Sequence, residues 1–393
     1  MRAWAEPAAD GFTVLRARSG EARLAGADRP ATPIVGFDAT SPGPVLRVRR
    51  GEELKVRLVN ELGEPTALHW HGVRLRNAMD GAPPLTQAAV APGASFDYRF
   101  VVPDAGTFWY RASFAPQQQR GLYGALVVAE AEAATDRDNV LVFADWPPDG
   151  GTPSRRFTVN GAPALDLPVR RNERLRLRFV NASRTQVMNA RIDGHRAVVM
   201  ALDGEPAEPF AARDSRIVLG PGNRADVFVD ALGAPGSIAP IVFTQEGGDA
   251  TLIRIVYDGG DAARPMPPGE AMSLPANPLP VRMNFSGALR VTLPIGEAPS
   301  PQSPLFTAAR GRTVMMALDN RDAGEHVVHL HGHHFRLLDR LDDGWKPYWL
   351  DTIVVLRRQI ARIAFVADNP GRWLIETQAL GGSAAATTWF AVD

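Results

Sequence analysis

Residues 50–60 read RGEELKVRLVN, and residues 171–181 read RNERLRLRFVN. A weaker third copy, RGRTVMMALDN, occupies residues 310–320. In the first two copies apolar and polar residues alternate, which is typical of a β-strand with one face against a core. The closing asparagines, Asn60, Asn181 and Asn320, are 121 and then 139 positions apart. Repeats at this spacing predict three tandem domains of similar fold.

The rest of the 393-residue chain also favours strands. Alternating segments recur, as in residues 95–101 and 251–257, and the 36 glycines and 33 prolines supply turns between them. Sustained helical periodicity is hard to find, so the sequence predicts β-sandwiches or barrels. A stretch rich in Pro, Gly and Ala separates the second and third domains. The predicted boundaries are 1–132, 133–260 and 279–393 for the three domains and 261–278 for the linker.

Composition excludes several classes of protein. The 43 basic and 43 acidic residues cancel, so no overall field attracts the chain to nucleic acid. There is no cysteine, which excludes disulfides, thiolate metal sites, iron–sulfur clusters and cysteine nucleophiles. No apolar run approaches the ~20 residues of a membrane span, and the first residues show no apolar signal-peptide core.

The repeat also organises the histidines. His69 and His71 are the ninth and eleventh residues after Asn60, and His329 and His331 have the same offsets from Asn320. Residues i and i+2 of a strand point to the same side, so each His-x-His pair presents two imidazoles on one face. Such pairs suit copper or zinc. Four histidines at matched offsets indicate a metal-binding ancestry, whereas a lone histidine is more often a structural residue.

At these positions the chain resembles the multicopper oxidase family, the laccase-like proteins with three cupredoxin domains. The resemblance covers nearly the whole chain. Residues 68–72 (LHWHG) are similar to the first copper motif, and residues 326–333 (HVVHLHGH) are similar to the third. Residues 106–110 (GTFWY) and 370–373 (PGRW) are similar to the segments that lead into the second and fourth. The resemblance implies an all-β fold of three tandem cupredoxin-like Greek-key β-sandwiches. We expect the first and third to pack against each other, so that their His-x-His pairs share one site.

The sequence departs from the family where the second and fourth motifs should place their ligands. By the family pattern, His69 and His329 correspond to the type 2 copper pair, His71 and His331 to type 3 ligands, and His326 to a vestigial type 1 ligand. Six His or Cys positions and the axial Met are replaced, and the residues now in those positions are Arg111, Ser113, Glu376, Thr377, Gln378, Gly382 and Thr387.

These losses remove the type 1 copper, the conducting cysteine and most of the three-copper cluster of the family. We therefore expect no four-copper oxidase activity, and no catalytic residues are assigned. Three functions stay open. The first is a copper-free periplasmic scaffold or partner-binding protein of the cell envelope. The second is a mononuclear copper or zinc protein with weak oxidase activity, using His69 and His329, either alone or with His71 and His331. The third is an oxidase with rearranged ligands, completed by His333, His334 or Glu376.

The resemblance also predicts what fills the former copper cavity. Lone charges in a closed cavity would be costly, yet the substitutions bring in one cation and one anion. We therefore expect an Arg111–Glu376 ion pair between the first and third domains, with Ser113 and Gln378 completing its hydrogen bonds. The alternative is that these side chains turn outward to solvent. Asp80 is expected to have only a structural role.

Overall fold

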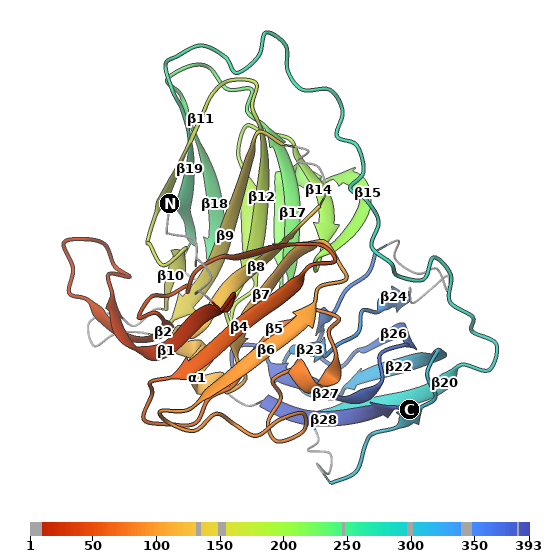
Figure 1. Ribbon diagram of the computed structural model, residues 1–393. Coiled ribbons are helices and arrows are strands. Elements are labelled where there is room, and N and C mark those ends of the chain that lie inside the picture. Colours follow the sequence, from red (N-terminus) through yellow and green to blue (C-terminus); the bar gives the residue numbers. More distant parts are fainter. Residues whose placement is uncertain are drawn as a thin grey trace.

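The computed structural model is almost entirely β-structure, arranged as three β-sandwiches (Figure 1). It describes residues 10–130, 135–147, 155–245, 248–296, 302–338, 348–382 and 385–393. Each sandwich pairs two sheets and encloses its own apolar core. Every sheet contains one parallel pair of strands that are not consecutive in sequence, so a longer connection than a hairpin joins each such pair. The predicted fold class is confirmed.

The first sandwich is drawn from red to orange in Figure 1. Its two sheets have the strand orders β2-β1-β4-β6 and β3-β8-β7-β5. Short helices η1 and α1 lie in its connections. The bounds are β1 Thr13–Ala22, β2 Thr32–Phe37, β3 Leu46–Arg49, β4 Glu53–Asn60, β5 Leu68–His71, η1 Asn77–Met79, β6 Ser95–Val101, β7 Gly106–Ala112, α1 Ala115–Gln119 and β8 Tyr123–Ala129.

The second sandwich contains the largest sheet, with the order β10-β9-β12-β17-β14-β15, packed on β11-β19-β18-β13-β16. Its bounds are β9 Arg137–Trp146, β10 Arg156–Val159, β11 Leu165–Val169, β12 Arg174–Asn181, β13 Met188–Ile192, β14 Ala197–Leu202, β15 Glu205–Ala211, η2 Arg213–Ser215, β16 Arg216–Leu219, β17 Arg224–Asp230, β18 Ile238–Gln245 and β19 Gly248–Tyr257.

The third sandwich has the orders β20-β22-β26-β24 and β21-β28-β27-β23-β25. Its bounds are β20 Leu289–Ile295, β21 Thr307–Ala308, β22 Arg312–Asn320, β23 His326–Leu330, β24 Arg336–Leu338, β25 Thr352–Val355, β26 Ile360–Ala367, β27 Gly371–Ala379 and β28 Ala385–Val392.

The sequence repeat forms equivalent strands β4, β12 and β22, and the structure explains its fixed residues. The second residue of each copy (Gly51, Asn172 and Gly311) has a positive φ, which glycine and asparagine adopt most readily. The closing asparagines are buried. Each amide donates to backbone carbonyls, two for Asn60 and Asn181 and three for Asn320, and each side-chain oxygen accepts from the backbone N–H two residues later. The repeat therefore conserves a buried strand terminus whose polar groups are satisfied.

Residues 258–288 contain no helix or strand and run along the second sandwich toward the third (Figure 1). The Asn277 amide bonds the backbone N–H and C=O of Ala105, and it also donates to Glu205. One buried side chain of this connection thus bridges the first and second sandwiches.

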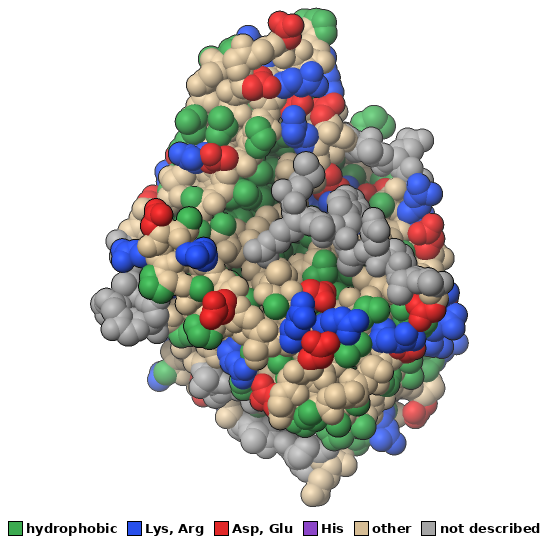
Figure 2. Space-filling model, turned by 60° about the vertical axis from the view of Figure 1, so that its left-hand side comes forward, with side chains coloured by type: hydrophobic (Ala, Val, Ile, Leu, Met, Phe, Trp, Pro, Cys, Tyr) green, Lys and Arg blue, Asp and Glu red, His purple; other side chains and the backbone are tan. Residues whose placement is uncertain are grey.

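None of the described helices has the length and apolar character needed to cross a bilayer. On the face drawn in Figure 2, basic and acidic side chains are interspersed.

Candidate metal centre

Two strand pairs bring the predicted histidines together. Strand β5 pairs with β7, which places His69 opposite Arg111 and His71 opposite Trp109. Strand β23 pairs with β27, which places His329 opposite Glu376. The two pairs face each other across the junction of the first and third sandwiches. Arg111 and Glu376 replace one ligand position each in the second and fourth motifs, and each is therefore the cross-strand neighbour of a surviving histidine.

The four imidazoles form one buried cluster, so the expected shared site is confirmed. Each histidine is at most 3% exposed. The rings of His69 and His331 stack with centroids 3.8 Å apart, and those of His71 and His329 stack at 3.6 Å. Ligand atoms of His69, His71 and His329 lie within 4.8 Å of one another, as do those of His69, Asp80 and His331. Asp80 is therefore part of the cluster.

His69 and His329 turn their Nε2 atoms toward each other at 3.2 Å. The Nδ1 of His69 lies 3.0 Å from the carbonyl of Asp80, and that of His329 lies 3.0 Å from the carbonyl of Asp351. Carbonyls only accept, so both Nδ1 atoms carry the proton. Burial, with the nearby His331, lowers the pKa of His69, and burial lowers the pKa of His329 to about 3. The unprotonated Nε2 atoms of two neutral rings therefore face each other with their lone pairs. A cation bound between them would stabilise this arrangement.

His71 is oriented differently. Its Nε2 lies 2.9 Å from Thr352 Oγ1, and its Nδ1 accepts a 3.4 Å hydrogen bond from Arg111 Nε. Burial, together with His329, holds the pKa of His71 well below its usual value. Both ring nitrogens of this imidazole are thus engaged by protein groups.

His331 is the charged member of the cluster. Its Nδ1 lies 2.9 Å from Asp80 Oδ2, and its Nε2 lies 3.4 Å from Glu376 Oε1. Burial opposes protonation of the ring, but Asp80 and Glu376 outweigh it and raise the pKa of His331 to about 9.

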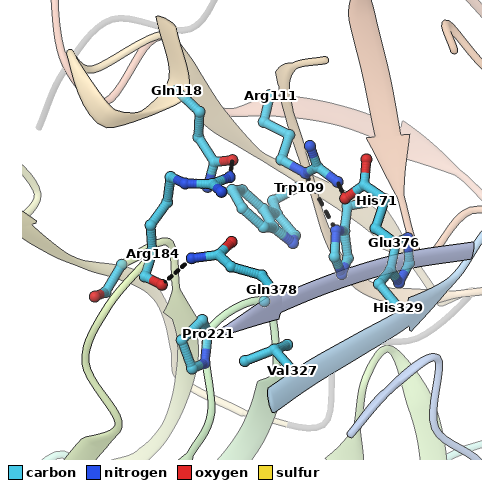
Figure 3. Close-up of a pocket in the computed structure, with 12 residues that line it drawn as sticks. His71, Trp109, Arg111, Gln118, Arg184, Pro221, Val327, His329, Glu376 and Gln378 are labelled. Carbon is cyan, nitrogen blue, oxygen red and sulfur yellow. Dashed lines mark hydrogen bonds and ion pairs between the residues drawn. The ribbon is translucent and has the colours of Figure 1, made fainter. Parts of the chain in front are cut away.

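The predicted ion pair is present. Arg111 Nη2 lies 2.5 Å from Glu376 Oε2, and Arg111 is buried beside His71 (Figure 3). Burial opposes ionisation of Glu376, but Arg111 and His331 hold the pKa of this carboxyl well below its usual range. The predicted roles of Ser113 and Gln378 are wrong. Ser113 Oγ donates to the carbonyl of Gly81, and Gln378 Nε2 donates to the carbonyl of Arg184, because backbone acceptors lie closer to these side chains.

The other vestigial positions lie away from the cluster. His326 Nε2 contacts Asp322 Oδ2 at 2.8 Å, and Thr377 Oγ1 donates to the carbonyl of Ala386. Gly382 lies in the turn after β27, and Thr387 is exposed on β28. The structure therefore separates these residues from the four imidazoles.

Sequence reasoning missed the polar layer behind the cluster. Asp351 accepts two hydrogen bonds from the Arg224 guanidinium, at 2.9 and 2.6 Å, and both residues are fully buried. Thr352 Oγ1 donates to Asp351 Oδ1 at 2.7 Å. Since Thr352 also contacts both His71 and His329, this layer orients the rings. The sequence does carry one sign of this layer, since Asp351 and Thr352 interrupt the otherwise apolar residues 349–355.

A pH-dependent contribution to stability follows from His331. Its folded-state pKa of about 9 exceeds the ordinary value of 6.5, so its stabilisation is complete below pH 6.5 and is lost as pH rises through 9. We expect the stability difference between metal-free wild type and His331→Gln to shrink by about 3 kcal/mol between pH 6.5 and 9. Urea unfolding at both pH values measures it, and a difference that stays constant with pH would contradict the assignment.

Comparisons with known proteins match this chain to one family over most of its length. Three family profiles described as multicopper oxidase match residues 20–133, 125–243 and 275–381. The chain is 29% identical to multicopper oxidase MmcO of Mycobacterium tuberculosis, over 88% of this chain and 80% of that protein.

Solved structures give the same result. Lac15 from a marine microbial metagenome is 34% identical, with a TM-score of 0.86 over 96% of this chain and 99% of that one. A multi-copper oxidase from Pseudomonas thermotolerans is 31% identical, with a TM-score of 0.85 over 97% and 98%.

Proposed function

The chain belongs to the multicopper oxidase family, and on that premise we propose that an ion pair has replaced its oxidase centre and that it acts as a non-catalytic binding protein. The Arg111–Glu376 pair inside the histidine cluster carries this proposal. A guanidinium now lies beside His71, where the family resemblance expects an imidazole-bound copper. The proposed location is the periplasm, with a protein partner in the cell envelope, as the resemblance implies.

The residues present do not fit a four-copper centre. The chain has no cysteine to supply a thiolate. His71 is engaged at both nitrogens, and His331 is protonated between two carboxylates. A protonated imidazole cannot be a metal ligand.

One specific observation favours a second candidate function, a single copper or zinc ion at His69 and His329. These histidines come from different sandwiches, keep Nδ1 bound to carbonyls and direct both Nε2 lone pairs to one point. Imidazole ligands lie about 2.0–2.1 Å from copper or zinc, which a 3.2 Å nitrogen separation permits. A bound ion there would act as a Lewis acid or as a weak redox centre.

Copper loading tests both proposals. We expect at most one copper per chain, no intense thiolate-to-copper absorption band, and no oxygen uptake with a phenol comparable to that of a four-copper relative measured in parallel. If the ion binds between His69 and His329, His69→Ala should abolish copper binding. The matched control His326→Ala should still bind copper, because His326 contacts Asp322 instead of the cluster. Elemental analysis after gel filtration gives the stoichiometry.

The outcomes separate the candidates. No retained copper supports the metal-free protein, and one copper that depends on His69 supports the mononuclear site. Four coppers per chain, or oxidase turnover at the rate of the relative, would overturn the proposed loss of the oxidase centre.

A further inference from the structure

We propose that the pocket where the three sandwiches meet binds a small carboxylate monoanion, with Arg184 as its principal ligand. This proposal goes beyond the function proposed above and does not depend on metal binding. The pocket receives Trp109 and Gln118 from the first sandwich, Arg184 from the second and Gln378 from the third (Figure 3). The cavity itself measures about 40 Å³, which admits the charged head group of a small molecule and excludes a folded partner.

The pocket lining carries one uncompensated positive charge. Its charged side chains are Arg111, Arg184 and Glu376, and Glu376 is already paired with Arg111. The lining histidines add no charge, because His71 Nδ1 accepts a hydrogen bond from Arg111 and the Nε2 of His329 faces the Nε2 of His69. The surplus charge therefore resides on Arg184.

Arg184 is buried without a counter-ion. It is 8% exposed and forms no ion pair within the residues that the structure describes. The nearby carboxylate of Asp145 is engaged by Arg155 and by the hydroxyls of Ser183 and Thr185. Burial, with the like charge of Arg111, lowers the pKa of Arg184 to about 10. A buried cation that lacks a partner is costly, so an anion in the pocket would be stabilised.

The free donors match a carboxylate. Arg184 Nη1 donates to Gln118 Oε1 at 3.0 Å, and among the described residues its Nε and Nη2 have no acceptor. These two groups form the edge of a guanidinium that binds both oxygens of a carboxylate. The indole N–H of Trp109 is buried without an acceptor, and an indole can only donate. In Figure 3 this indole lies between Arg184 and His71.

The remaining lining decides the size and type of the anion. Pro221, Val327 and the Trp109 ring give the pocket an apolar wall. One surplus charge calls for a monoanion, and an apolar wall beside polar donors favours a carboxylate with a short apolar body over a fully hydrated dianion. Benzoate and acetate are therefore the probes, with sulfate as the dianion for comparison.

The test is a titration of metal-free protein at constant ionic strength, followed by isothermal calorimetry and by the thermal unfolding midpoint. We expect benzoate to bind wild type more tightly than acetate and to raise the midpoint. Arg184→Gln should weaken benzoate at least about tenfold, because the bidentate charged contact is lost. Trp109→Phe should weaken it several-fold, since the indole N–H is removed together with part of the apolar wall.

The matched control is Arg120→Gln. Arg120 follows helix α1, pairs with Glu64 and is exposed, so this variant removes the same charge near the pocket without changing its lining. Its benzoate affinity should equal that of wild type. Absence of binding to wild type, equal affinity in Arg184→Gln, or a preference for sulfate would each overturn the proposal. If Arg184→Gln does not fold, the wild-type titration and Trp109→Phe still decide.

Discussion

Asp351→Ala is expected to lower the free energy of unfolding by about 3–5 kcal/mol, the range for breaking one partner of a buried ion pair. Asp351 and Arg224 are both 0% exposed, and they join the third sandwich to the second at 2.6 Å. Removal of the carboxylate leaves Arg224 buried without its strongest counter-ion. Burial opposes ionisation of Asp351, yet Arg224 and the neighbouring histidines hold its pKa well below the usual value, which agrees with a strongly stabilised carboxylate.

The matched control for Asp351 is Asp166→Ala. Asp166 pairs with Arg254 at 2.6 Å, but both side chains are 49% exposed. An exposed pair of the same type contributes about 0–1 kcal/mol, so this variant should lie close to wild type. Urea unfolding of both variants measures the difference. Equal stabilities would show that Asp351 is not the anchor of the junction. Should Asp351→Ala fail to fold, Asp351→Asn, which keeps the shape and removes the charge, takes its place.

Glu376→Ala is the second large effect, and we expect a loss of about 3 kcal/mol, at the low end of the range for buried pairs because the Glu376 side chain is 23% exposed. The variant leaves Arg111 buried and removes one of the two carboxylates that stabilise protonated His331. The pKa of His331 should fall with it, since Glu376 is one of the groups that raise it. Titration of the histidine by NMR provides a readout separate from stability.

The exposed pair Glu53–Arg99 supplies the control for Glu376, with side chains 37% and 50% exposed. Glu53→Ala should change stability by less than about 1 kcal/mol. Replacement of both partners, Arg111→Met with Glu376→Leu, should cost less than Glu376→Ala alone, because no charge is then left buried without a partner. A near-neutral Glu376→Ala, or a double variant less stable than the single one, would show that the pair does not stabilise the cluster.

The buried pairs Asp351–Arg224 and Arg111–Glu376 together connect the three sandwiches without requiring a metal. Arg224 connects the second sandwich to Asp351 in the third and also donates to the carbonyl of Thr107 in the first. Arg111 and Glu376 connect the first and third directly. All three sandwiches therefore share charge-assisted hydrogen bonds around the histidine cluster, and this arrangement supports a protein that is stable whether or not an ion is bound.

The sequence by itself determined the three sandwiches and the meeting of the two His-x-His pairs. The sandwiches depend on local patterns, namely the alternation of β4 and β12, the positive-φ residue before each strand and the buried asparagine after it. The meeting of the two pairs follows from the resemblance to the family. The ion pair could also be predicted, because a closed cavity that receives one cation and one anion leaves them few other partners.

Only the tertiary structure decided the rest. Alternation predicts an exposed face for β12, yet Arg176 and Arg178 are buried, because Asp226 and the first sandwich cover that face. Ser113 and Gln378 donate hydrogen bonds to backbone carbonyls, and no sequence pattern predicts these acceptors. Arg184 lies far from both histidine motifs in sequence, and Asp351 and Thr352 follow His329 by 22 and 23 residues. Their roles arise because folding brings together segments separated by more than a hundred residues. Only in the folded protein is it decided that Asp351 pairs with a buried arginine and that Arg184 is buried without a counter-ion.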